Sequence, residues 1–131
     1  MAREPVLVSL CASRRIDSAA GGAVATHVLS APDHYRLALG VDEIVVGADL
    51  TALDANAGVA IRIEWSWDGL KWRLGTTVIT EKTAVDVYTG VFNTAAERTP
   101  FVRVIAEVRD VTTTAPVGAT LDAWALYKYN A

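Results

Sequence analysis

The sequence has few of the side chains on which enzymes and metal sites depend. Its 131 residues include one cysteine, two histidines and one methionine. A single cysteine excludes an internal disulfide bond and any metal cluster built from several thiolates. Basic residues are not in excess either, since 12 Lys and Arg stand against 15 Asp and Glu. The resulting net charge of −3 argues against a nucleic-acid partner, because such proteins displace counterions from phosphate with clustered Lys and Arg.

Long apolar runs are missing as well. No run approaches the ~20 residues that a membrane-spanning helix needs, so we expect no membrane partner. The first apolar run, Val6–Cys11, is too short for the apolar segment of a secretion signal. We therefore expect the chain to be made in the cytoplasm without a signal peptide.

Apolar residues are nevertheless abundant. They form 52% of the chain, and the mean hydropathy is +0.28, so a disordered chain is excluded and a sizeable core is expected. The length fits one domain, which we place at residues 1–131.

The apolar residues follow the period of two that half-buried strands show. In Val59–Trp67 every second residue is large and apolar, whereas Arg62, Glu64 and Ser66 fall on the opposite face. Nine segments of this kind are short and bounded by turn residues. They are Val6–Cys11, Ala23–Leu29, Tyr35–Leu39, Glu43–Ala48, Val59–Trp67, Lys71–Ile79, Ala84–Tyr88, Phe101–Val108 and Thr120–Tyr129. The breaks between them leave no room for crossover helices. We predict an all-β fold, a two-sheet antiparallel β-sandwich of about eight or nine short strands, with a jelly roll as one form of it.

The residues from Trp67 to Trp72 predict a β-hairpin. The Asp68–Gly69 pair suits the two central positions of a type I′ turn, both of which need positive φ. A two-residue turn places Glu64 opposite Arg73, whereas a four-residue turn pairs Trp67 with Trp72. Both registers keep the apolar residues on one face, and the charge pairing favours the shorter turn.

Residues for catalysis or metal binding are scattered. His27 lies in an expected apolar strand and His34 in an expected turn, so neither is placed to activate a nucleophile. Asp49, Asp54 and Asn56 share an expected loop and carry oxygen ligands of the kind that Ca²⁺ accepts, but their spacing matches no EF-hand. We expect no enzyme, no catalytic residue, no metal site and no cofactor.

Large aromatic residues gather at the hairpin and on the last expected strand. We expect Trp65 and Trp72 to cap the core and Trp67, at the hairpin tip, to reach outward. Both faces of the last strand carry apolar residues, so a second surface should cover it. The candidate interface residues are Trp67, Trp124, Leu126, Tyr127 and Tyr129.

Residues 66–72, Ser-Trp-Asp-Gly-Leu-Lys-Trp, resemble the Ser/Thr-x-Asp-Gly-x-x-Trp turn of small β-sandwich proteins from tailed bacteriophage particles. Pro100–Val104 and Leu121–Lys128 are similar to the final two strands of the same proteins. The resemblance begins at Val59 and covers about half of the chain, and carbohydrate-binding and discoidin-like sandwiches share the hairpin. It implies a virion structural protein, such as a head decoration or cement protein, a head fibre or a related tail component, with no catalytic residues.

Two functional hypotheses follow. The first is a non-catalytic subunit of a virion or other particle, located at the particle surface, which docks on a protein lattice and forms a homo-oligomer. Its contacts would come from the last strand and from Val6–Cys11. The second is a carbohydrate-binding module in which Trp67 and neighbouring aromatic rings stack on sugars.

Overall fold

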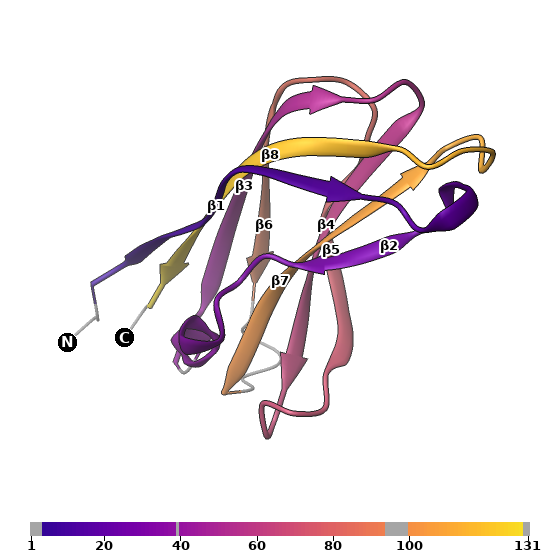
Figure 1. Cartoon of the computed structure of the whole chain (residues 1–131). Helices are drawn as coiled ribbons and strands as arrows, with labels where there is room; N and C mark the ends of the chain where they lie inside the picture. The colour runs from indigo at the N-terminus through magenta and orange to yellow at the C-terminus, as the bar shows by residue number, and fades with distance from the viewer. Residues whose placement is uncertain (1–3, 39, 94–99, 130–131) are drawn as a thin grey trace.

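The structure, a computed structural model, describes residues 4–38, 40–93 and 100–129 (Figure 1). These residues form eight strands in two antiparallel sheets of four. Sheet A has the strand order β1-β8-β3-β6, and sheet B has the order β2-β7-β4-β5. The strands are β1 (Val6–Asp17), β2 (Ala25–Val28), β3 (Glu43–Leu53), β4 (Ala57–Ser66), β5 (Arg73–Lys82), β6 (Val87–Asn93), β7 (Phe101–Asp110) and β8 (Gly118–Lys128). The predicted two-sheet antiparallel β-sandwich is confirmed.

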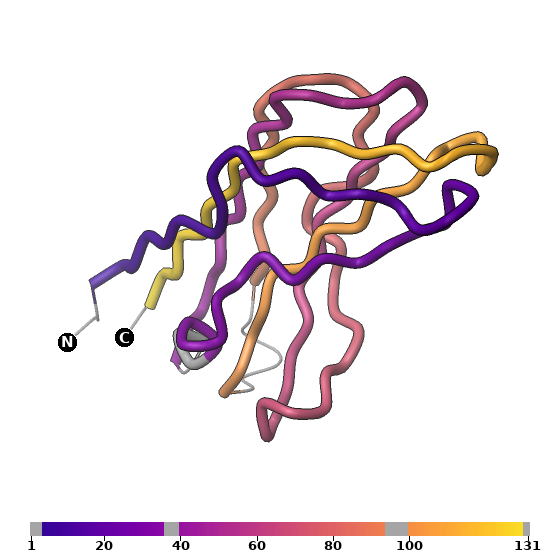
Figure 2. Tube along the Cα trace, in the orientation of Figure 1, coloured from indigo at the N-terminus to yellow at the C-terminus, as the bar shows by residue number. Residues whose placement is uncertain are grey.

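The strand pairing is that of a jelly roll. β1 pairs with β8, β2 with β7, β3 with β6 and β4 with β5, so early strands meet late strands in nested order. The β3–β8 and β4–β7 contacts then join these pairs into the two sheets. The chain thus runs as one long antiparallel ribbon wound into two layers, as the trace in Figure 2 shows. This is the eight-stranded arrangement of a jelly roll.

One of the nine expected strands is wrong. The segment predicted as Tyr35–Leu39 belongs mainly to a 3-10 helix, η2 (Pro32–Ala38), and residue 39 lies outside the described residues. Pro32 begins this helix because its fixed φ suits a first helical turn and its missing N–H needs no partner there. The His34 N–H donates to the Ala31 carbonyl at 2.9 Å and closes the turn. The other expected strands overlap observed ones, with their ends shifted.

The predicted register of the hairpin is also wrong. Trp65 pairs with Arg73 and Glu64 pairs with Leu74, so neither the two-residue nor the four-residue turn forms. In the Asp68–Gly69 pair only Gly69 has positive φ, at 78°, which excludes a type I′ turn.

Side-chain hydrogen bonds hold the wider loop from Trp67 to Trp72. Ser66 Oγ accepts from the Gly69 N–H at 2.8 Å, and Asp68 Oδ1 accepts from the N–H groups of Leu70 and Lys71, both at 2.9 Å. Such local bonds from Ser and Asp compete with a tight backbone turn. They explain why the loop is longer than the Asp-Gly pair alone predicts.

The core lies between the sheets and consists of the inward-facing residues of every strand. Trp65 is 5% exposed and meets the Phe92 ring edge-on at 4.5 Å between centroids, so its expected place in the core is confirmed. Tyr127, Ile44, Ile61, Ile63 and Leu121 are among the large side chains that are fully buried. Trp72, in contrast, is half-buried outside sheet B, so its expected place in the core is wrong.

The two sides of the sandwich close in different ways. At the β5–β6 side, a Cβ on Gly90 would lie 2.1 Å from the Val78 carbonyl oxygen, so the missing side chain lets the two strands come together. At the β1–β2 side, Arg14 Nη1 donates to the Val28 carbonyl at 2.9 Å and His27 Nε2 donates to the Asp17 carbonyl at 2.8 Å. Side chains thus link the two edge strands there.

The helices of the described residues are short 3-10 turns, and none of them is long and apolar enough to cross a membrane.

Candidate interaction surface

The outer face of sheet A carries an apolar row that crosses all four strands. Leu7 pairs with Leu126, Leu126 with Val45, and Val45 with Val91. Because side chains alternate along a strand, these four residues point away from the core. Leu7 is 67% and Val91 is 58% exposed, and the other two are half-buried. We call this row, together with Trp124, the A face.

Trp124 lies flat against the sheet in the next row. A Cβ on Gly47, its neighbour on β3, would lie 2.0 Å from Trp124 Cε2, so only glycine leaves room for the ring. Ser9 and Thr89 continue this row on β1 and β6. The indole ring is thereby held on the backbone of β3 and adds to the apolar surface.

One border of the A face is anionic. Asp49 and Asp122 lie directly opposite each other on β3 and β8. Asp122 Oδ1 accepts from the Ser13 N–H at 2.6 Å, whereas the Asp49 carboxylate has no hydrogen-bond or ion-pair partner among the described residues. At the other border Lys128 pairs with Glu43 at 3.3 Å, and this pair is neutral.

The outer face of sheet B is occupied by an ion-pair network. Glu64 Oε2 accepts from Arg62 at 2.8 Å and Glu64 Oε1 pairs with Arg103 at 2.8 Å. Arg62 also pairs with Glu107. Burial raises the pKa of Glu64, but the bonds from the two arginines outweigh it and hold that pKa below its usual value.

Aromatic rings cover part of this network. The Arg103 guanidinium lies 4.2 Å from the ring centroid of Trp72, and Tyr35 meets Trp72 edge-on at 4.9 Å. Tyr35 comes from η2, which packs on β7. The charged groups Glu64, Arg62 and Arg103 of this face therefore pair within the chain, although Arg62 Nε has no hydrogen-bond partner.

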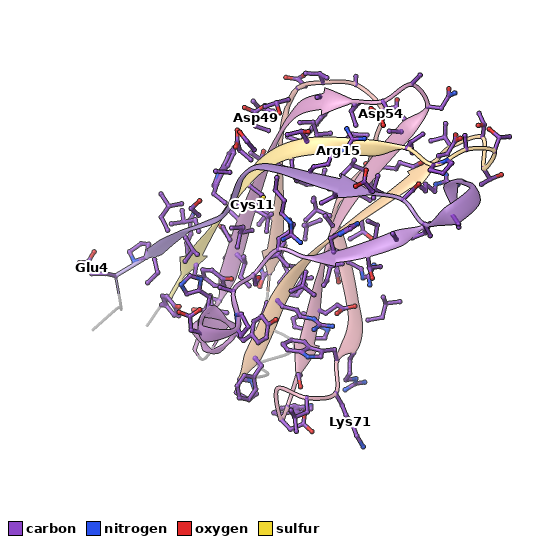
Figure 3. The ribbon with its side chains drawn as sticks, in the orientation of Figure 1. Glu4, Cys11, Arg15, Asp49, Asp54 and Lys71 are labelled. Carbon is purple, nitrogen blue, oxygen red and sulfur yellow. The ribbon has the colours of Figure 1, made fainter. Side chains whose placement is uncertain are left out.

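A second exposed apolar group lies at the end of the β4–β5 hairpin. Trp67, Leu70 and Leu74 are 64%, 83% and 76% exposed, and the exposed cations Lys71 and Arg73 lie between them in the chain. Figure 3 shows Lys71 projecting from this end of the molecule. We call these five residues the tip. The expectation that Trp67 reaches outward is confirmed.

The candidate interface residues separate into two groups. Trp124 and Leu126 lie on the A face and Trp67 on the tip, where they are open to a partner. Tyr127 and Tyr129 are 0% and 5% exposed, so the expectation that they reach a partner is wrong for the folded chain. Burial raises the pKa of Tyr127 to about 12. The alternation along β8 turns both tyrosines inward.

Val45 and Val91 are absent from the predicted interface, whereas Leu7 lies in Val6–Cys11, the first segment expected to make contacts. Each lies at an outward position of an alternating strand, which the sequence shows. Their assembly into one row depends on the order β1-β8-β3-β6 and on its register, which no local pattern encodes.

The residues considered for chemistry lie apart. His27 bridges β1 and β2, and His34 belongs to η2. Asp54 pairs with Arg15 at 2.7 Å and accepts from the Gly118 N–H at 2.8 Å, while Asp49 lies on β3. Within the described residues no group of three His, Cys, Asp or Glu side chains is placed to hold a metal ion. The absence of catalysis and of cofactors stays a prediction.

Comparisons with known proteins give the fold and not a family. No protein-family model and no curated protein matches the sequence. Among solved structures, 97% of the chain superposes on the VP2 subviral particle of infectious bursal disease virus, with a TM-score of 0.58, 11% identity and 32% of that chain covered. A structure of the Gx strain of this virus gives 98% of the chain, a TM-score of 0.54, 10% identity and 33% coverage.

A weaker likeness, with a TM-score of 0.45, is to the CBM22-1 xylan-binding domain of Paenibacillus barcinonensis Xyn10C. It has 14% identity and covers 100% of this chain and 86% of that domain. The chain spans only about a third of the length of the viral chains. What is shared with those chains is the β-sandwich fold.

Proposed function

We propose that this protein is a non-catalytic structural subunit of a virion or another protein particle and that it docks on a protein lattice. The observation that carries the proposal is the A face. Its apolar row crosses four strands, and two of its residues are more than half exposed. Contiguous apolar surface of this kind on a folded chain is typical of a protein–protein contact.

The difference between the two outer faces supports this proposal. On sheet B, Glu64 pairs with Arg62 and Arg103, and the Trp72 ring covers Arg103. On sheet A, Leu7 and Val91 have no such cover. A partner that removes this apolar area from water gains about 25 cal/mol for each Å² of it.

The fold agrees with the proposal. The jelly roll is shared with the infectious bursal disease virus protein that forms a subviral particle, and jelly rolls are common in viral capsids. Because one fold can carry many functions, the type of particle subunit is proposed from the hairpin Ser66–Trp72. Its resemblance to tailed-phage sandwich proteins favours a head decoration, cement or fibre subunit at the virion surface.

Particles from the source of this sequence provide the test. They are separated on a density gradient, and the fractions are probed with an antibody raised against the purified chain. We expect the chain to migrate with the particles and immunogold labelling to fall on their surface. A chain found only in fractions of free protein would contradict the proposal.

A second candidate function is carbohydrate binding, which the exposure of Trp67 favours. A tryptophan that is 64% exposed offers a flat ring on which a sugar can stack. A glycan array compares the unchanged chain with Trp67→Ala and with Leu70→Ala as the matched control. Binding that is lost only in Trp67→Ala supports this function. No bound glycan, or binding that Trp67→Ala leaves intact, excludes it.

A further inference from the structure

Two exposed apolar regions of this chain carry opposite charge. The A face is bordered by the paired carboxylates Asp49 and Asp122. The tip presents Lys71 and Arg73 among its exposed apolar residues. The one carboxylate of the loop, Asp68, is charged and accepts hydrogen bonds from the N–H groups of Leu70 and Lys71 at 2.9 Å. Two cations against this one carboxylate leave the tip with a net positive charge.

These two regions cannot meet within one chain. Figure 3 labels Asp49 and Lys71 at opposite ends of the molecule. Asp49 lies on sheet A, and the tip connects two strands of sheet B. Any contact between the tip and the A face therefore joins two copies.

We propose that the tip of one copy docks on the A face of the next copy, head to tail. Trp67 and Leu70 would cover part of the apolar row from Leu7 to Val91, whereas Leu74, next to Arg73 on β5, points to the other side of that strand. The cations Lys71 and Arg73 would neutralise the carboxylates at its border. This inference rests on the proposed particle function and adds to it the contact by which the subunits associate.

Charge favours this arrangement over the stacking of two A faces. A second A face brings another Asp49 and Asp122, and its Lys128 is already paired with Glu43 at 3.3 Å. Among the described residues of the face it supplies no unpaired cation, and like charges that face each other across an interface disfavour association. The tip supplies two cations.

A head-to-tail contact has a consequence for assembly. The two surfaces differ, so a bound pair keeps a free A face on one copy and a free tip on the other. Such heterologous contacts close into rings or continue as open arrays, whereas a symmetric contact stops at a dimer. An extended array is what a particle surface needs.

Charge reversal tests the contact. The face variant is Asp49→Lys with Asp122→Lys, the tip variant is Lys71→Glu with Arg73→Glu, and a third variant combines all four changes. Sedimentation velocity at low salt measures association, and circular dichroism checks that each variant is folded. Thr76→Glu with Thr80→Glu, at exposed positions of β5, is the control for added charge.

We expect the unchanged chain and the control to associate as concentration rises. The face and tip variants should each weaken association by roughly 100-fold or more. Both an equimolar mixture of the two variants and the fourfold variant should regain it, because each restores opposite charges at the contact.

Three results would overturn the inference. A tip variant that associates like the unchanged chain would mean that two A faces stack. A fourfold variant that fails to regain association while folded would mean that the two charged groups do not meet. An unchanged chain that stays monomeric but migrates with particles on the gradient would make another particle protein the occupant of the A face, and the proposed function would stand without this contact.

Discussion

Glu64 accepts hydrogen bonds from two arginines on a surface where its side chain is only 11% exposed. Water is largely excluded there, so the charges depend on one another more than an exposed pair would. The Trp72 ring above Arg103 strengthens this dependence by cation–π attraction. A single carboxylate therefore organises much of the outer face of sheet B.

We expect Glu64→Gln to lower the free energy of unfolding by about 2 kcal/mol, because two largely buried guanidinium groups lose their shared counter-charge. Urea denaturation followed by tryptophan fluorescence measures the change. Glu81→Gln is the control, since the Glu81 and Arg109 side chains are 33% and 39% exposed, and a pair as exposed as this contributes up to about 1 kcal/mol. Equal losses in the two variants would contradict this account.

Gly47 leaves room for the Trp124 ring on the outer face of sheet A. Gly47→Ala would press a methyl group into the Trp124 ring, and such overpacking costs about 1–3 kcal/mol. The same change in a Trp124→Ala background should cost much less, because the ring is gone. A double-mutant cycle by thermal denaturation compares the two costs. Equal costs would show that the backbone of β3, and not the ring, requires the glycine.

At the scale of elements, two loops are held by aspartates instead of by tight backbone turns. Asp68 holds the β4–β5 loop, and Asp110 holds the β7–β8 loop. Asp110 accepts from the N–H groups of Thr112 at 2.8 Å and Ala115 at 3.0 Å. The Thr112 hydroxyl also donates to Asp110, at 2.6 Å. These bonds favour the charged carboxylate, so they lower the pKa of Asp68 to about 2 and hold the pKa of Asp110 well below its usual value.

The lowered pKa values predict a loss of stability in acid. A carboxyl group whose pKa is lower in the folded chain stabilises the fold above its unfolded pKa of about 3.9. That contribution disappears as the pH falls through the folded value, so the urea midpoint should drop between about pH 4 and pH 2. In Asp68→Asn the drop over this range should be smaller. An unchanged drop would mean that other carboxyl groups cause it.

For these elements, the sequence pattern predicts the position of the strands better than their register. The alternation in Val59–Trp67 and Phe101–Val108 is enough to place β4 and β7 and to separate their buried and outward faces. The register of β4 and β5 could not be predicted from the sequence, because Ser66 and Asp68 close the loop through side-chain hydrogen bonds that compete with a type I′ turn. Both faces of β8 carry apolar residues, so its pattern does not show that Tyr127 and Tyr129 face the core. That depends on where the second sheet packs.

At the scale of the whole molecule, nested pairing joins distant parts of the chain. Val6 pairs with Tyr127, and the last strand completes sheet A between β1 and β3. The fold class followed from strand lengths and short breaks. The strand order, and with it the row from Leu7 to Val91, required the three-dimensional structure.

Nested pairing also predicts slow folding. Contacts between residues far apart in sequence form only after long loops have closed, and this closure costs conformational entropy. Such β-sandwiches therefore fold in roughly milliseconds to seconds. Stopped-flow dilution from urea, followed by tryptophan fluorescence, measures the rate. Folding complete within microseconds would mean that local contacts dominate, contrary to the pairing of β1 with β8.

Arg14 and His27 protect the edge strands β1 and β2 against pairing with another chain. By binding the Val28 and Asp17 carbonyls, they occupy acceptors on the edge strands β1 and β2. Free edge acceptors are templates on which a foreign strand can grow into amyloid-like stacks. With two of them blocked, this side of the sandwich is a poorer template for a foreign strand. Variants that lack these side chains should form thioflavin-positive fibrils sooner than the unchanged chain does.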